Sequence, residues 1–197
     1  MENEIKEDRR IRKSKRAIRQ ALVKMLSQKN LEDITITEIS KEADVNRKTF
    51  YNYYETTYQV IEEIENDIVR SFEEVLSNIN IKEDLKQPIK IFETLTSIIQ
   101  NDFEFYSDLI KSQKVGGIIL ISKISDVFKQ RVRAVLPVEM FEDDFTMELS
   151  INFIIAGMLE VYKVWLQDSK GISLEKLSKG MSTIIFLGLN GVITEGE

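Results

Sequence analysis

Residues 35–54 read TITEISKEADVNRKTFYNYY, and this stretch predicts two short helices joined by a tight turn. Thr35 followed by Glu38 is the spacing of a capping box, in which each residue satisfies a free backbone N–H of the other at a helix start. A first helix is therefore expected directly after Thr35. Asn46 has a side-chain oxygen that can cap a second helix. The small side chain of Ala43 allows the two helices to cross closely.

The second helix of this pair opens with side chains suited to DNA. Phe50 is expected to face inward together with Val45 and Tyr54. The side chains expected to face outward are Arg47, Lys48, Thr49, Tyr51, Asn52 and Tyr53. An α-helix fits the major groove, where Arg and Lys bind guanine acceptors and Asn binds adenine or a phosphate. Two short helices with cations opening the second are typical of a helix-turn-helix, although an ordinary helical hairpin with a basic face is the alternative.

Charge is divided unevenly along the chain. Residues 1–56 hold 13 Lys and Arg against 10 Asp and Glu, whereas residues 57–197 hold 14 against 23. Residues 9–29 carry nine basic residues and no acidic one. A basic N-terminal segment on an acidic body orients a protein toward a polyanion. The predicted phosphate contacts of this segment, which fall close to one helix face, are Arg9, Arg12, Arg16 and Arg19.

Composition excludes several classes of function. The 197 residues include no Cys and no His, which removes disulfides, thiolate nucleophiles, histidine-based triads and the usual zinc and copper sites. With no phosphate-binding glycine loop either, we expect neither enzyme activity nor a cofactor. The N-terminus lacks the apolar core of a signal peptide, and no uncharged run reaches the roughly 20 apolar residues of a membrane span. A soluble cytoplasmic protein is expected.

Apolar residues recur at helical spacing along nearly the whole chain, which predicts an all-α fold. About nine helices are expected, over 8–28, 36–43, 46–53, 57–79, 88–101, 103–113, 116–135, 143–168 and 173–193. The charge balance turns acidic where the fourth of these begins. Two domains are therefore predicted: a three-helix helix-turn-helix DNA-binding domain over 1–56, and a larger all-helical domain over 57–197. Dimerisation and ligand binding by the larger domain are expected from its apolar last helices and from a family resemblance.

A basic first helix, then TITEISKEADVNRKTFYNYY, then a long acidic amphipathic helix together resemble the TetR/AcrR family of transcriptional regulators. This motif covers roughly residues 8–65, and the rest of the chain is similar in length, helix content and its two apolar last helices. The resemblance implies a repressor that binds a palindromic operator as a homodimer and releases the DNA when a small ligand binds the larger domain. The alternative is a helical co-activator or interaction module whose C-terminal domain binds a partner protein instead of a small ligand.

Carried onto this sequence, the resemblance implies phosphate contacts from Thr35 and Thr37, base contacts from Arg47, Lys48 and Thr49, and backbone contacts from Tyr51 and Tyr53. Asn46 and Asn52 join this set because an amide binds adenine or a phosphate. Two positions depart from the family pattern. Asp44 stands where the turn usually has Gly, and Asp tolerates a left-handed backbone better than most residues. Thr57 stands where a Lys often binds phosphate, so this contact is expected to come from the helix N-terminus and to be weaker.

The two most apolar helices expected are 143–168 and 173–193. Their apolar residues occupy more than one face, which indicates burial against the subunit's own core on one side and a partner subunit on the other. A monomer with a large core is the alternative. The predicted dimer interface consists of Ile151, Ile154, Met158, Trp165, Leu177, Met181, Ile184, Ile185 and Gly188.

A pocket for a small hydrophobic or aromatic effector is predicted between the middle and later helices. Its expected lining is Phe92, Phe103, Tyr106, Phe128, Met158, Tyr162 and Trp165. Aromatic residues at helical spacing equally suit a closed core, and both interpretations stay open at this point.

Overall fold

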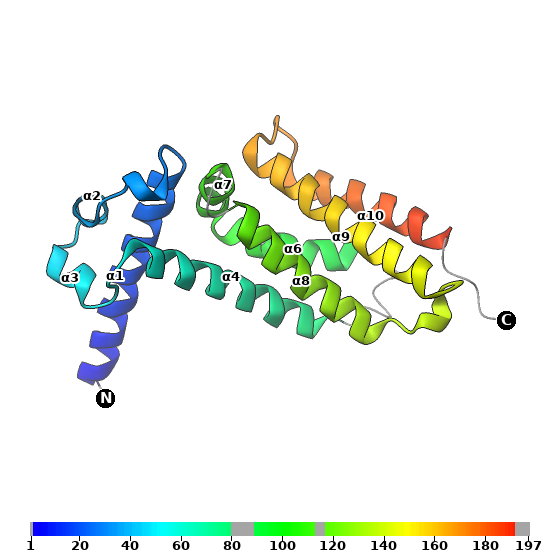
Figure 1. Ribbon diagram of the computed structural model, residues 1–197, viewed down its shortest axis with the longest axis horizontal. Helices are drawn as coiled ribbons and strands as arrows, with labels where there is room; N and C mark the ends of the chain where they lie inside the picture. The colour runs from blue at the N-terminus through cyan, green and yellow to red at the C-terminus, as the bar shows by residue number, and fades with distance from the viewer. Residues whose placement is uncertain (1, 80–88, 113–116, 192–197) are drawn as a thin grey trace. The chain divides into compact units, whose positions relative to one another are not determined.

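The computed structural model describes residues 2–79, 89–112 and 117–191 (Figure 1). These residues form nine α-helices and two short 3₁₀ helices, and the predicted all-α fold is confirmed. In chain order the elements are α1 (Glu2–Leu26), η1 (Leu31–Asp33), α2 (Ile36–Glu42), α3 (Arg47–Tyr51), α4 (Thr57–Asn78), α6 (Ile89–Asn101), α7 (Phe103–Lys111), α8 (Gly117–Val135), η2 (Val138–Met140), α9 (Asp144–Gln167) and α10 (Leu174–Asn190).

Helix boundaries differ from the predicted ones in two instructive places. α1 begins at Glu2 rather than at residue 8, so the acidic start of the chain continues the basic helix. α3 covers only Arg47–Tyr51, because Asn46 has an extended backbone and caps the helix from outside it. The predicted last helix ended at residue 193, and positions 192 and 193 lie outside the described residues.

Packing divides the chain into two compact units. The N-terminal unit takes in residues 1–68 and 104–119, and the C-terminal unit takes in residues 69–103 and 120–197. The helix α4 therefore begins in the first unit and ends in the second, without interruption. The predicted division after residue 56 into a DNA-binding and a larger domain stays a prediction about function.

The core of the N-terminal unit comes from α1, α2, α3 and α4. Ile18, Leu22, Ile39, Phe50 and Ile64 each have a relative exposure of 0%. Burying a side chain of this size contributes about 1.5–3 kcal/mol. Because Phe50 lies in this core, the short α3 is held by tertiary packing rather than by its own length.

The core of the C-terminal unit lies along one stripe of α9. The buried residues of this stripe are Met147, Ile151, Ile155, Met158, Tyr162, Trp165 and Leu166. A second apolar stripe of the same helix is exposed and contains Phe145, Leu149, Phe153, Val161 and Val164. Among the described residues, α9 is the one helix long and apolar enough to cross a membrane by length and composition. Its buried stripe is that of a core helix, and its exposed stripe requires a separate explanation.

Buried polar contacts set the register of the helices in the C-terminal unit. The Thr96 hydroxyl of α6 lies 3.0 Å from the Tyr162 hydroxyl of α9 and 2.9 Å from the Ser178 hydroxyl of α10. At the end of α9, Trp165 Nε1 donates a hydrogen bond to the carbonyl of Ile172 at 2.8 Å. A shift of one helix along another would leave these buried hydroxyls unpaired, which costs about 1–3 kcal/mol per group.

Candidate nucleic-acid interface

The predicted capping box begins α2. Thr35 Oγ1 accepts a hydrogen bond from the backbone N–H of Glu38 at 3.2 Å, and the Thr35 N–H donates to Glu38 Oε2 at 2.9 Å. Lys29 Nζ donates to the same carboxylate at 2.6 Å. The Lys29 bond, followed by those from Thr35, lowers the pKa of Glu38 to about 2. Because this pKa is depressed, the carboxylate stabilises the fold above the unfolded pKa of about 4.3, and this contribution is lost only as pH falls toward about 2.

The turn between α2 and α3 has a left-handed residue. Asp44 has a φ of +51°, the left-handed conformation that the sequence analysis expected Asp to tolerate at this position. The backbone N–H of Val45 donates to the carbonyl of Ser40 at 2.9 Å and closes the turn. The turn therefore forms without glycine, since Asp is among the residues that adopt this backbone most readily.

The first test concerns this turn. Asp44→Val is expected to lower the free energy of unfolding by about 1–2 kcal/mol, because a β-branched residue is strained at positive φ. Asp44→Asn is the matched control and should unfold like the wild type, since Asn tolerates the same backbone. Urea unfolding of both variants measures the difference. Equal stability of the two variants would contradict a turn that depends on this conformation.

The start of α3 is held by Asn46. Its Oδ1 accepts from the backbone N–H of Thr49 at 2.7 Å and from the Thr49 hydroxyl at 3.0 Å. The side-chain oxygen of Asn46 is therefore engaged inside the protein, whereas its NH₂ group has no hydrogen-bond partner among the described residues and the residue is exposed. Any DNA contact from Asn46 is consequently expected to be donated by its NH₂ group.

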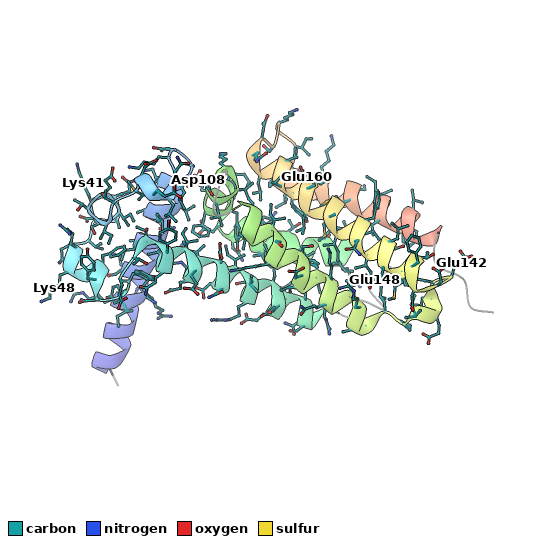
Figure 2. The ribbon with its side chains drawn as sticks, in the orientation of Figure 1. Lys41, Lys48, Asp108, Glu142, Glu148 and Glu160 are labelled. Atoms are coloured by element: carbon teal, nitrogen blue, oxygen red, sulfur yellow. The ribbon has the colours of Figure 1, made fainter. Side chains whose placement is uncertain are left out.

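Arg47 and Lys48 form the exposed cationic end of α3. Both side chains are exposed, and within the described residues neither has an ion-pair partner. Figure 2 shows Lys48 extending outward from α3. On the opposite side of the helix Phe50 is fully buried, with its ring 5.7 Å from that of Tyr54. A buried anchor thus orients α3 so that its cations face solvent.

The remaining predicted DNA contacts surround α3. Thr35, Thr37, Asn52 and Tyr51 are exposed, Tyr51 with 49% of its surface, whereas Thr49, Tyr53 and Thr57 are half-buried. The hydroxyl of Thr35 also donates to Glu38 Oε2 at 2.8 Å, so it is occupied within the capping box. At the start of α4 the N–H of Gln59 donates to Thr56 Oγ1 at 3.3 Å, which leaves Thr57 as the first helical residue. The DNA contacts of these residues stay predictions.

The basic residues of α1 separate into two groups. Lys15 Nζ contacts Glu63 Oε2 at 2.8 Å, and Arg19 Nη1 contacts Asp67 Oδ2 at 2.6 Å. The two pairs form a ladder between α1 and α4. Arg19 was predicted to contact phosphate; its guanidinium is paired with Asp67 and mostly covered, so it is now expected to hold α1 against α4 instead. Arg9, Arg12 and Arg16 are exposed.

Tyr54 lies beneath this ladder. Its ring is under Lys15, whose Nζ is 5.3 Å from the ring centroid. Burial, and then the nearby charge of Glu63, raises the pKa of the Tyr54 phenol. The phenol therefore stays neutral, and the ladder holds α1, α4 and the segment after α3 together.

A second test separates the two groups of cations. Arg9→Gln is expected to weaken binding to every DNA sequence alike and to lower the salt slope by about one unit, as for one lost phosphate contact. Arg19→Gln is expected to leave the slope unchanged and to lower stability by up to about 1 kcal/mol, because it removes a partly exposed ion pair. Salt titrations of DNA binding and thermal unfolding of both variants measure this. A reduced salt slope in Arg19→Gln would mean that Arg19 leaves Asp67 and contacts a phosphate when DNA binds.

The predicted pocket residues do not form one pocket. A cavity of about 90 Å³ in the C-terminal unit is lined by Phe92, Phe128 and Met158 of the predicted set. Its other lining residues are Leu76, Ile91, Val132, Leu136, Phe141, Ser150, Ile151, Ile154, Ile155 and Ile185.

The other four predicted pocket residues lie elsewhere among the described residues. Phe103 packs edge-on against Trp165 with their ring centroids 5.3 Å apart, and the Tyr162 hydroxyl is hydrogen-bonded to the Thr96 hydroxyl. Tyr106 belongs to the N-terminal unit. Of the predicted set, only Phe92, Phe128 and Met158 can therefore contact one molecule together in this cavity.

The predicted interface residues also separate. Ile151, Met158, Trp165 and Met181 are less than 10% exposed and pack in their own subunit, whereas Ile184 is 72% exposed. An apolar groove runs between α9 and α10, lined by Leu149, Ser150, Phe153, Ile154, Gly157, Met158, Val161, Met181, Ile184, Ile185 and Gly188. Leu177 is half-buried and lies outside the lining of this groove.

Sequence reasoning recognised that α9 is apolar on more than one face, but it left the members of the exposed face out of the predicted interface, and it missed the ladder between α1 and α4. The exposed residues Leu149, Phe153, Gly157 and Val161 follow one another at spacings of four, which marks a second face of α9. The ladder pairs two cations four apart in α1 with two carboxylates four apart in α4. Equal spacing on two helices is a weak signal by itself, because it does not say which helices are neighbours.

Comparisons with known proteins agree with this geometry. The family profile described as "Bacterial regulatory proteins, tetR family" matches residues 18–64, which contain the helix-turn-helix. NalD of Pseudomonas aeruginosa, the secondary repressor of the MexAB-OprM efflux pump, is similar over 94% of this chain and 100% of its own, with 14% identity and a TM-score of 0.64.

Two regulators named FadR have the same fold. FadR of Bacillus halodurans has 15% identity and a TM-score of 0.64 over 89% of this chain and 96% of its own. FadR of Thermus thermophilus, solved with lauroyl-CoA, has 16% identity and a TM-score of 0.54 over 92% and 97%. No curated protein sequence matches the chain.

The residues that match this family profile contain a capped helix-turn-helix with an exposed cationic second helix, the arrangement by which helix-turn-helix proteins bind DNA. Residues 18–64 thus match the tetR family of bacterial regulatory proteins, and the described chain has the TetR-like fold.

Proposed function

We propose that this protein is a repressor that binds a palindromic operator in the cytoplasm as a homodimer, with α3 of each subunit in the major groove. The observation that carries the proposal is the start of α3, where Asn46 fixes the backbone and Arg47 and Lys48 are exposed and unpaired within the described residues. Because the cap already orders the backbone that carries these cations, binding a base edge requires ordering only of their side chains, and Arg and Lys are the usual partners of guanine.

The groove between α9 and α10 supports the homodimer. Its rim includes Phe153 with 78% and Ile184 with 72% of their surface exposed. Large apolar side chains in contact with water favour association, and a two-fold pair would bury the same stripe from both subunits. Two-fold pairing would also place two recognition helices in successive major grooves, roughly 34–36 Å apart or a multiple of this.

The cavity of the C-terminal unit supports a small effector. Of its lining residues only Ser150 has a polar side chain, and the Ser150 hydroxyl already donates to the carbonyl of Thr146 at 2.7 Å. A charged group would lie there without a partner, which is costly. The part of the effector that enters is therefore an uncharged alkyl or aryl group, and its binding releases the operator.

Selection of bound sequences from random DNA tests the proposal directly. The purified protein should enrich a palindrome whose half-sites are about 10 base pairs apart, centre to centre, or a multiple of this. Enrichment of a single half-site would contradict the two-fold arrangement. Failure to enrich any sequence, with binding that depends on salt alone, would contradict specific operator recognition.

A further inference from the structure

The guanidinium of Arg131, on α8, binds the C-terminal end of α4. Its Nε donates to the carbonyl of Leu76 at 3.0 Å, and Nη2 donates to the carbonyls of Ser77 at 3.4 Å and Ile79 at 3.3 Å. The last carbonyls of a helix have no partner within the helix, and they carry the negative end of its dipole. Arg131 therefore caps α4 and at the same time joins its last turn to α8.

The turn that Arg131 holds is also a wall of the effector cavity. The side chain of Leu76 lines the cavity, and so do those of Phe128 and Val132, which flank Arg131 on α8. One turn earlier on α4, Phe72 packs on Phe128 with their ring centroids 5.9 Å apart. A molecule that fills the cavity must therefore press on the turn of α4 that Arg131 holds.

The other part of α4 belongs to the N-terminal unit. There Glu63 and Asp67 pair with Lys15 and Arg19 of α1, in the unit that contains the recognition helix. We propose that Arg131 is the positioning residue through which occupation of the cavity changes DNA affinity. The inference rests on the proposed effector function. When Arg131 holds the last turn, a molecule that presses on Leu76 displaces α4 as a whole. Without Arg131 only the last turn moves, and the displacement does not reach the N-terminal part of α4.

A double-mutant cycle on the full-length protein tests this without an identified effector. Ile155→Phe, from a buried position of α9 in the cavity lining, places side-chain volume where a ligand would lie. With Arg131 present it is expected to weaken operator binding about tenfold, within the usual range of allosteric factors. In the R131M background the same substitution should change the affinity less than about twofold. Operator affinities of the four proteins at one salt concentration measure the cycle.

Two further variants separate coupling from stability. R133M removes another arginine of α8, which pairs with Glu148 of α9 at 2.6 Å and not with α4, so the full response to Ile155→Phe should remain. R131K keeps the positive charge but lacks the planar guanidinium with its several donors, so it should restore part of the response of operator affinity to Ile155→Phe. A purely structural role would lower the melting temperature of R131M and leave the response ratio unchanged.

The outcomes distinguish this inference from the proposed function. If Ile155→Phe changes operator affinity equally with and without Arg131, the proposed role of Arg131 is wrong, while the cavity is still supported as the effector site. No response in either background would overturn the cavity as an effector site, and the role of Arg131 with it. If circular dichroism shows that Ile155→Phe does not fold, Ile151→Phe replaces it, since Ile151 is buried in the same lining.

Discussion

Replacing Gly157 with arginine is expected to produce a folded subunit that no longer pairs and binds its operator about 10²–10⁴-fold more weakly. Gly157 lines the apolar groove of α9 and α10, and a Cβ added there meets no atom within 4 Å in the subunit. The subunit itself gains a better helix former than glycine. In a pair, the new cation would be buried against apolar side chains without a partner, which is strongly unfavourable.

Gly180→Arg is the matched control for this prediction. Gly180 lies on α10, also has open space around its Cα, and does not line the groove. The Gly180→Arg protein should therefore stay a dimer and keep its operator affinity. Sedimentation at micromolar concentration and operator titration measure both variants.

Two results would contradict the pairing model. A Gly157→Arg protein that remains a dimer would show that pairing uses another surface. A wild-type protein that sediments as a monomer even with operator present would contradict the homodimer. That result would favour the alternative in which the C-terminal helices bind a different protein.

The second large effect is expected at the start of α3. Arg47→Ala or Lys48→Ala should weaken operator binding by about 1–3 kcal/mol if the residue contacts a base, and should relax the preference at one base position. Both side chains are exposed, so their truncation removes no core contact and the fold should be retained. Footprints and affinity measurements on the selected operator test the change.

Lys90→Ala serves as the control for this pair. Lys90 is an exposed lysine on α6 in the C-terminal unit, so its removal alters net charge by the same amount as Lys48→Ala. Its loss should reduce affinity only slightly and for all sequences alike, because a distant charge acts through screened electrostatics. Unchanged footprints and affinities in Arg47→Ala and Lys48→Ala would contradict the proposal that α3 lies in the major groove.

The helix-turn-helix could be predicted because the interactions that define it are local. Thr35 and Glu38 are three positions apart, as are Asn46 and Thr49, and both contacts form as their spacing indicates. The left-handed turn at Asp44 likewise follows from the tolerance of one residue type for one backbone conformation. Such features depend little on the rest of the chain.

The candidate effector site could be predicted only in part. Phe92, Phe128 and Met158 lie around one cavity, whereas Trp165 and Tyr162 have their polar atoms hydrogen-bonded to other groups of the C-terminal unit. Aromatic residues at helical spacing mark an apolar face in either case. Whether that face surrounds a cavity depends on how completely the neighbouring helices fill the space.

The sequence by itself determined the positions of the helices, the capped helix-turn-helix and the presence of two apolar stripes on α9. Only the tertiary structure decided which stripe is buried and which is exposed, and which cations of α1 are paired. Helical periodicity records the faces of a helix, but not which neighbour covers each face. That depends on residues far apart in the chain, such as Arg19 with Asp67 and Arg131 with the end of α4, whose contacts form only when the chain folds.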